Sequence, residues 1–282
     1  MAKTESMIEK VFNYLDNIPR QAFWGIVLGI MILVTLNPIN SPINVTDYTK
    51  TVYNIVDNTT SGDVVVVASR NQFMWCVEAA STTIAFLNHL STKEGVKVIF
   101  FPYGPESAFF FQYCLDLSDY PKTKEYGKDY VMLEYVPGLL VTVSLFVNDI
   151  SSVIRSDFYG KPVDEIPVME GINSIHDVDI WCTIGSFVQA EVYYVRPASE
   201  TVKIIDLEQS AVFIWNYMYV TAGLIDGMTN GMVAGGEYEK LMGAPGIGQT
   251  GVDALNLIYV LVIGSIIIGN ISYFVKRRKG VN

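Results

Sequence analysis

The sequence has few of the residues, and none of the short motifs, that usually carry catalysis. It contains only two histidines, His89 and His176, and neither has a partner at metal-ligand spacing. A histidine-based metal site or a Ser-His-Asp triad is therefore not expected. The stretch ASRNQF (68–73) stands where a dinucleotide-binding protein would carry G-x-G-x-x-G, and P-loop and G-x-S-x-G motifs are also missing. We predict no catalytic and no metal-ligating residue, and the sequence leaves any cofactor undetermined.

Cysteine is equally scarce. The three cysteines form no C-x-x-C pair, and each lies in an apolar run: Cys76, Cys114 and Cys182. This placement is typical of buried free thiols, and one disulfide with one cysteine left over is the alternative.

Positive charge is depleted in the middle of the chain. The whole sequence carries a net charge of −10, and residues 40–251 contain 12 basic and 25 acidic residues, a net charge of −13. Such a segment is not expected to bind nucleic acid. Its acidity attracts cations or a basic partner, or simply confers solubility.

What the sequence does contain is a long uncharged segment near each end. Residues 22–38 follow Lys3, Lys10 and Arg20, whereas residues 255–275 precede a KRRK cluster. By the positive-inside rule, both spans place the chain ends in the cytoplasm and the middle of the chain outside. A cleaved signal peptide is the alternative for the first span, but no A-x-A site follows it. We predict a two-pass cell-membrane protein in contact with the lipid bilayer, divided into a cytoplasmic segment (1–21), a span (22–38), an extracytoplasmic domain (39–251), a span (255–275) and a basic cytoplasmic tail (276–282).

Two glycosylation sequons agree with this topology. Asn44 and Asn58 each begin an N-x-T triplet just outside the first span, and both are predicted acceptors. A third triplet at Asn270 lies inside the second span, where no acceptor can be modified.

Small residues recur at four-residue spacing in both spans and in the Gly-rich stretch 226–251. Such spacing lets helices approach closely, so we predict helix association and a homo-oligomer, or assembly with other membrane proteins. In the Gly-rich stretch, a flexible connection is the alternative. The predicted association residues are Gly25, Gly29, Ser265, Gly269, Gly231 and Gly235, together with Asn270 as a polar group that needs a partner in lipid.

The segment between the spans alternates apolar runs with helical patterns. Strands are expected at 63–69, 96–101, 129–136, 178–184 and 202–207. The pattern predicts an α/β fold, a Rossmann-like three-layer sandwich with a mostly parallel sheet of about five strands. The apolar stretch 211–225 is predicted as a core helix, with a third membrane helix as the alternative.

In such a sheet, ligands bind beyond the carboxyl ends of the strands. Polar residues follow several of the expected strands, and helix N-termini at the same edge favour anions. They form a candidate ligand site, and the alternative is that they only cap helices. The candidates are Arg70, Asn71, Glu106, Ser107, Ser186, Glu208 and Gln209.

Three segments in the second half carry a family resemblance: IGSFVQAE (184–191), GGEYEKLMGA (235–244) and the final span. Over roughly the last 100 residues, the chain resembles an uncharacterised family of prokaryotic membrane-anchored proteins with a Rossmann-like outer domain. That resemblance and the outer sequons suit an archaeal cell surface. It implies no known activity.

Three functions fit these observations. The first is a non-enzymatic envelope protein that acts as an oligomeric scaffold. The second is an extracytoplasmic ligand-binding or sensory module that uses the strand-end crevice near Arg70. The third is a membrane-bound hydrolase that depends on carboxylates and a divalent metal.

Overall fold

The computed structural model describes residues 18–70, 73–185 and 188–278. The chain forms two compact units. One consists of the residues up to Ser41 together with those from Thr250 onward, and the other, the α/β domain, is Pro42–Gln249. The predicted segments 1–21, 39–251 and 276–282 stay predictions, and part of each terminal segment lies outside the described residues.

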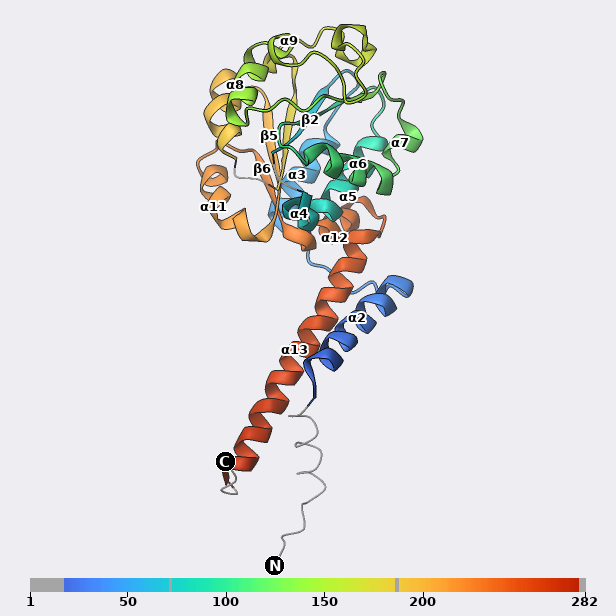
Figure 1. The fold of residues 1–282 in the computed structure, drawn as a ribbon, viewed down its shortest axis with the longest axis vertical. Helices are drawn as coiled ribbons and strands as arrows, with labels where there is room; N and C mark the ends of the chain where they lie inside the picture. Colours follow the sequence, from blue (N-terminus) through green and yellow to red (C-terminus); the bar gives the residue numbers. More distant parts are fainter. Residues whose placement is uncertain (1–17, 71–72, 186–187, 279–282) are drawn as a thin grey trace, which may run out of the picture. The chain divides into compact units, whose positions relative to one another are not determined.

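One parallel sheet organises the α/β domain (Figure 1). All pairings between its described strands are parallel, in the order β3-β2-β1-β4-β5-β6. The predicted α/β class with a parallel sheet is confirmed, but the sheet has six strands rather than about five. The strands are β1 (Val64–Ser69), β2 (Lys97–Pro102), β3 (Tyr130–Met132), β4 (Ile180–Ile184), β5 (Lys203–Glu208) and β6 (Gly227–Asn230).

The valine run explains why β1 occupies the middle of the sheet. Its residues pair with β2 on one side, as in Val64 with Lys97, and with β4 on the other, as in Val65 with Ile180. All six of its residues are buried. A strand covered on both faces and paired on both edges needs an apolar residue at nearly every position, and four consecutive valines meet that need.

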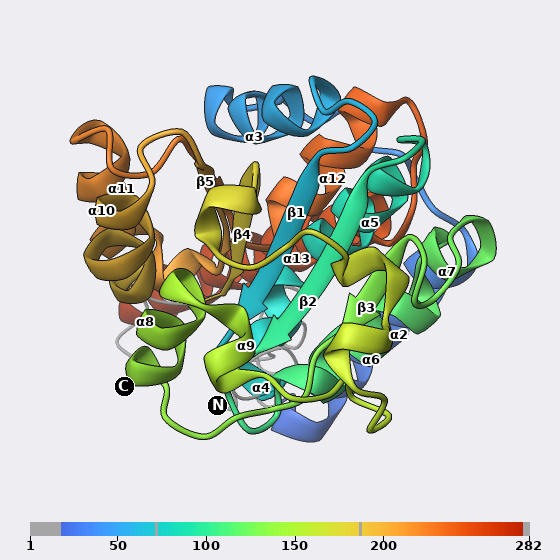
Figure 2. The same cartoon turned by 90° about the horizontal axis from the view of Figure 1, so that it is seen from above.

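Helices cover both faces of the sheet, which gives the α/β domain three layers. One core cluster joins the sheet to α3, α5, α6 and α12, and the other joins it to α8, α9 and the segment after β4. Figure 2 shows α3, α5 and α12 on one side of the strands and α8, α9 and α10 on the other. The helices of the domain are α3 (Asp47–Asp57), α4 (Phe73–Cys76), α5 (Ala80–Ser91), α6 (Ser107–Leu117), α7 (Tyr120–Thr123), α8 (Leu140–Asn148), α9 (Ile150–Val153), α10 (Arg196–Ala198), α11 (Ser210–Thr221) and α12 (Gly231–Met242), with single turns at η1 (Val77–Ala79), η2 (Val163–Glu165), η3 (Pro167–Met169), η4 (Ile175–Asp177) and η5 (Glu191–Val195).

The sixth strand lies in the stretch that we predicted as a Gly-rich connection. Residues Gly227–Asn230 read GMTN, which has neither an apolar run nor a clear alternation, so periodicity gives no strand signal there. The strand forms there because of its packing against α3. A Cβ atom at Gly227 would lie 3.0 Å from a methyl group of Val52, so the missing side chain lets α3 pack directly on this edge strand.

The glycines of α12 serve a close contact inside the domain. Gly235 packs against Ser81 of α5, and a Cβ atom there would lie 2.7 Å from the Ser81 Cβ atom. Gly231, at φ +61°, faces Ser210 and Glu78. The predicted helical spacing of these glycines is therefore used within the chain, and association between copies through Gly231 and Gly235 stays a prediction.

Two buried carboxylates hold the end of the domain together without a cation. Glu237 accepts hydrogen bonds from the backbone N–H of Thr46 and from the hydroxyls of Thr46 and Thr49, at 2.5–3.1 Å. Glu239 accepts from the backbone N–H groups of Gly246, Gly248 and Gln249 at 2.7–2.8 Å. These last donors belong to the first turn of α13, where N–H groups have no partner within the helix. Glu239 thus caps α13 from α12.

The other unit contains two apolar helices, α2 (Arg20–Leu36) and most of α13 (Ile247–Arg278). Among the described residues, one helix is long and apolar enough to cross a membrane, over Ile247–Val275, whereas α2 has 17 residues and is shorter than such a span. Within this unit, Asp253 accepts hydrogen bonds from the backbone N–H groups of Ile39, Asn40 and Ser41 at 2.8–2.9 Å. The carboxylate therefore fixes the segment after α2 to α13.

The polar residues of the predicted second span bond to their own helix. Ser265 Oγ donates to the Leu261 carbonyl at 2.7 Å, and Asn270 Nδ2 donates to the Ile266 carbonyl at 2.8 Å. Asn270 therefore has a partner without a second helix. A Cβ atom added at Gly25, Gly29 or Gly269 would meet no other atom within 4 Å, so these positions leave open surface on α2 and α13.

The stretch 211–225 is largely a surface helix of the domain. As predicted, α11 belongs to the α/β domain, but only Val212 and Asn216 are buried along it. Its outer face exposes Ile214, Trp215 and Met218. Cys114 and Cys182 are free and buried, as predicted, and the side chain of Cys76 lies outside the described part.

The close contact between α12 and α5 predicts the effect of a single methyl group. We expect Gly235→Ala to lower the free energy of unfolding by about 1–3 kcal/mol, because the new Cβ atom overlaps Ser81. Chemical unfolding of the detergent-solubilised full chain, followed by near-UV circular dichroism, measures this change. Val233→Ala on the exposed face of the same helix is the control and should change little. An unchanged stability for Gly235→Ala would show that the two helices separate without cost.

Candidate functional site

The strand order creates one point at which the sheet opens toward a ligand. The chain builds outward from β1 to β2 and β3, then returns to place β4 on the other side of β1. The connections after β1 and β4 therefore leave in opposite directions, and in parallel α/β sheets this is the position of the ligand crevice, beyond the carboxyl ends of the strands. The candidate site lies at this switch point between β1 and β4.

Arg70 bridges the crevice. It follows β1 directly, and its Nη1 atom donates to Gln189 Oε1, beyond β4, at 3.4 Å. The backbone of Arg70 is fixed from the β2 side, because a Cβ atom at Gly104 would lie 2.7 Å from the Arg70 Cα atom. Only glycine fits at position 104, and the tight contact holds Arg70 at the mouth of the crevice.

The predicted residues after β2 have a structural role. Glu106 Oε2 accepts a hydrogen bond from the Phe73 backbone N–H at 2.8 Å, and Ser107 Oγ donates to Ser69 Oγ at 3.3 Å. Both contacts tie the connection after β2 to the connection after β1. Of the other predicted residues, Asn71 and Ser186 lie outside the described residues.

Two buried carboxylates from β5 lie on one face of the sheet. Asp206 and Glu208 alternate with the apolar Ile205 and Leu207, so both acids point toward the face covered by α8 and α11. Asn216 of α11 donates through Nδ2 to Asp206 Oδ2 at 3.0 Å and also to Glu208 Oε2. One amide therefore joins both acids to the helix above them.

Glu208 and Gln209 also fasten β5 to its neighbours. Glu208 Oε1 accepts from the Gln209 backbone N–H at 2.8 Å, and Gln209 Nε2 donates to the Gly185 carbonyl at 3.3 Å. Gly185 follows β4, so these bonds connect the end of β5 to the rim of the crevice.

A third buried acid, Glu191, comes from the segment after β4. Its Oε1 atom accepts from Thr183 Oγ1 at 2.6 Å and from Trp181 Nε1 at 3.2 Å. Thr183 pairs with Asp206 across the sheet, which brings the third acid beside the other two. Glu191 begins a π-helical turn (Glu191–Val195), and Pro197, which has no N–H to donate, follows that turn.

Burial changes the protonation of all three acids. It raises the pKa of Asp206 well above its usual range, and the charge of Glu208 raises it further. Burial also raises the pKa of Glu208 to about 7 and that of Glu191, although hydrogen bonds from Thr183 and Trp181 and the charge of Arg70 oppose the shift at Glu191. In the folded state these shifts favour the protonated, uncharged forms of the acids.

Two carboxylate oxygens of this cluster have no hydrogen-bond partner in the part of the chain that the structure describes. They are Glu191 Oε2 and Asp206 Oδ1, and both residues are fully buried. A buried acceptor without a donor costs about 1–3 kcal/mol. The cluster therefore has capacity for hydrogen-bond donors from a bound molecule or water.

The sequence pointed to only part of this site. It predicted Arg70, Glu208 and Gln209, which the structure places around the crevice, but missed Asp206, Glu191, Gln189 and Asn216. Two signals were present: an acid inside the apolar strand VKIIDL, and a lone Asn in an otherwise apolar helix. Each polar residue amid a buried run requires a partner, and these two are partners of each other.

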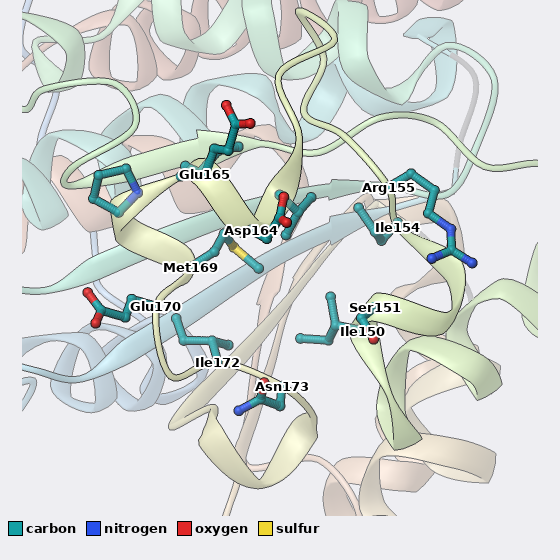
Figure 3. Close-up of a pocket in the computed structure, with 13 residues that line it drawn as sticks. Ile150, Ser151, Ile154, Arg155, Asp164, Glu165, Met169, Glu170, Ile172 and Asn173 are labelled. Carbon is teal, nitrogen blue, oxygen red and sulfur yellow. The ribbon is translucent and has the colours of Figure 1, made fainter.

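A separate cavity of about 710 Å³ lies beside α9 and the turns η2 and η3. Figure 3 shows Ile154, Met169 and Ile172 among its lining residues, with Arg155 and Glu170 on opposite sides. Arg155 and Glu170 are exposed, as are the other charged residues in its lining. The switch-point crevice is the stronger candidate because buried carboxyl oxygens with no hydrogen-bond partner among the described residues lie beside it, whereas the charged residues that line this cavity are exposed.

The described residues contain no group of three or more His, Cys, Asp or Glu side chains placed to hold a metal ion. The metal-dependent hydrolase considered above therefore has no ligand set in this part of the chain. Asn44 and Asn58, the predicted acceptors, are both exposed, and their glycosylation stays a prediction.

Comparisons with protein families, with curated proteins and with solved structures found no match to this chain.

The buried acids predict how stability depends on pH. A carboxyl group whose pKa is higher in the folded state contributes stability below its unfolded pKa, and this contribution is lost as the pH rises through the folded pKa. For Glu208 these values are 4.5 and about 7. We expect the free energy of unfolding to fall by on the order of 3 kcal/mol between pH 5 and pH 8.

Chemical unfolding of the solubilised full chain across this pH range measures the slope. Glu208→Gln removes the titrating group and should flatten the profile, whereas Glu170→Gln at an exposed position should leave it unchanged. A profile for Glu208→Gln as steep as that of the parent chain would contradict the assignment.

Proposed function

We propose that this chain is a membrane-anchored binding protein whose α/β domain takes a small polar ligand in the crevice between β1 and β4. The observation that carries the proposal is a pair of buried carboxyl oxygens, Glu191 Oε2 and Asp206 Oδ1, that have no hydrogen-bond donor among the described residues. Parallel sheets bind their ligands at this position.

The chemistry of the site favours a particular kind of ligand. Buried carboxyl groups accept hydrogen bonds from amine or hydroxyl groups, whereas Arg70 at the mouth donates to acceptors such as phosphate or carboxylate. A ligand that carries amine or hydroxyl groups on one side and an anionic group on the other matches both.

The anchoring part of the proposal is supported by length, composition and charge. Ile247–Val275 is long and apolar enough to span a bilayer, and Lys276–Lys279 follow it. With α2 as a second, short span, both ends of the chain are cytoplasmic and the α/β domain is extracytoplasmic. The exposed sequons at Asn44 and Asn58 are consistent with that side.

Thermal-shift measurements on the full chain in lipid nanodiscs test ligand binding. The probes are ethanolamine phosphate, inositol phosphate, spermidine, ATP and inorganic phosphate. A probe that binds in the crevice raises the apparent melting temperature by about 5–10 °C at roughly 100 times its Kd. Arg70→Ala and Glu191→Gln should reduce this shift.

The matched control is Arg155→Ala, which removes the arginine of the other cavity. A shift that survives Arg70→Ala but not Arg155→Ala would place the ligand beside α9 instead. The absence of any shift in the parent chain, with all five probes, would count against a binding function.

A second candidate function, an oligomeric scaffold, is favoured by the open glycine surface on α2 and α13. Gly25, Gly29 and Gly269 meet no other atom within 4 Å of an added Cβ atom. Small residues in membrane helices allow such close approach between copies.

Native mass spectrometry of the detergent-extracted chain tests this candidate. We expect a discrete oligomer, and Gly25→Leu combined with Gly29→Leu should dissociate it, because the larger side chains block close approach. The control is Leu36→Ala, on the exposed surface of α2. Gly127→Leu would not serve as a control, because Gly127 has a positive φ that leucine rarely adopts. A strictly monomeric parent chain would rule out the scaffold.

A further inference from the structure

The two edges of the sheet differ sharply in polarity. The connections that leave the carboxyl ends of β1, β2, β3 and β5 expose large apolar side chains. Six of them, 56–78% exposed, define what we call the apolar rim: Met74, Trp75, Phe109, Val141, Ile214 and Trp215. In Figure 1, α4 and α11 lie at this edge and α9 at the opposite one.

The opposite edge is polar. The connection into β2 reads TKEGV (92–96), and the connection into β3 reads KEYGKD (124–129). Single exposed apolar residues are ordinary on soluble proteins, but six of this size from four connections at one edge are not.

The start of the apolar helix α13 lies close to the same edge. A Cβ atom at Gly248 would lie 2.5 Å from the Gly236 backbone nitrogen, and Gly236 is five residues into α12. Because α12 begins at the carboxyl end of β6 and rises about 1.5 Å per residue, its first turns lie within about 10 Å of that edge. The Glu239 carboxylate fixes this arrangement through Gly246, Gly248 and Gln249.

We propose that the apolar rim rests on the lipid bilayer at the boundary between headgroups and acyl chains. The proposal depends on the membrane anchoring proposed above, because the chain passes from Gln249, near this edge, directly into the apolar part of α13. Tryptophan favours that boundary, and the rim carries two. Four separate connections form no single groove, so a flat, fluid surface fits them better than a folded partner. Because the rim residues are apolar, its contact with the bilayer rests on apolar burial.

Fluorescence quenching in nanodiscs tests the contact. A bimane label is attached to the full chain as Ile214→Cys or as Glu94→Cys, the exposed control at the polar edge. Cys76→Ser serves as the background, since Cys114 and Cys182 are buried. With phosphatidylcholine that carries a nitroxide near the headgroup, we expect at least a twofold stronger quenching at position 214 than at position 94. Raising the salt concentration from 50 to 500 mM should not change the ratio.

A third label, Ile263→Cys in α13, tests the membrane span independently of the contact between the rim and the bilayer, with a lipid that carries its nitroxide in the acyl chain. Quenching of position 263 by this lipid, without headgroup quenching at position 214, would overturn the docking while leaving the anchor intact. No acyl-chain quenching at position 263 would overturn the anchor, and the docking with it. If position 214 is shielded from aqueous iodide without lipid quenching, a protein partner or second copy covers the rim and the proposal is wrong.

A double variant guards against a local effect of the label. Trp75→Glu with Phe109→Glu changes only exposed side chains, and with both in place the lipid quenching at position 214 should fall at least twofold. Unchanged quenching would show that position 214 reaches lipid without the rest of the rim, which would also overturn the proposal.

Discussion

Parallel pairing of every strand is the constraint on which the rest of this structure depends. Because all strands point the same way, each connection must cross from the carboxyl edge to the amino edge, and all six strand ends meet at one edge. The return of the chain to β4 beside β1 then opens the only divergence between the described connections of this sheet. The crevice, the apolar rim and the start of α12 all lie at that edge for this single topological reason.

Satisfying buried carboxylates is the second constraint, because the domain has few cations to pair them with. Three solutions occur. Glu237 and Glu239 accept from backbone and hydroxyl groups, as Asp253 does in the other unit. Asp206 and Glu208 both accept from Asn216, and burial raises the pKa of both acids. Glu191 has hydrogen-bond partners at only one oxygen among the described residues. The first solution fixes the ends of the domain, whereas the other two leave a site with unused acceptors.

Hydrophobic periodicity predicted the strands that consist of an unbroken run of apolar residues. The valines of β1 and the apolar runs of β2, β4 and β5 identified those strands to within one or two residues, and the alternation with helices predicted the parallel sheet. It missed β6, because Gly227 was selected for contact with Val52 rather than for strand propensity. It also predicted a longer β3, which ends at Met132 because Leu133 bridges to Asp157 instead.

The candidate site was less predictable for a related reason. Arg70, Glu208 and Gln209 follow strands directly, so topology alone placed them at the crevice. Asp206, Asn216 and Glu191 come from a strand, a helix and a π-helical turn, and only their packing brings them together. A sequence shows that each is a polar residue in an apolar setting, but it does not show that they are one another's partners.

The crevice and the apolar rim lie at the same edge of the sheet, so contact of the rim with lipid affects which ligand can enter the crevice. An apolar rim in contact with lipid lowers the dielectric constant around the crevice, which favours the protonated forms of Asp206 and Glu208. A soluble ligand then has to displace lipid to enter, whereas a molecule that already lies among the headgroups does not. The amine, hydroxyl and anionic groups that suit the acids and Arg70 are also the groups that lipid headgroups present. Docking of the rim therefore shifts the expected ligand from a freely diffusing solute toward a headgroup, and ethanolamine phosphate and inositol phosphate are the thermal-shift probes that carry headgroup chemistry.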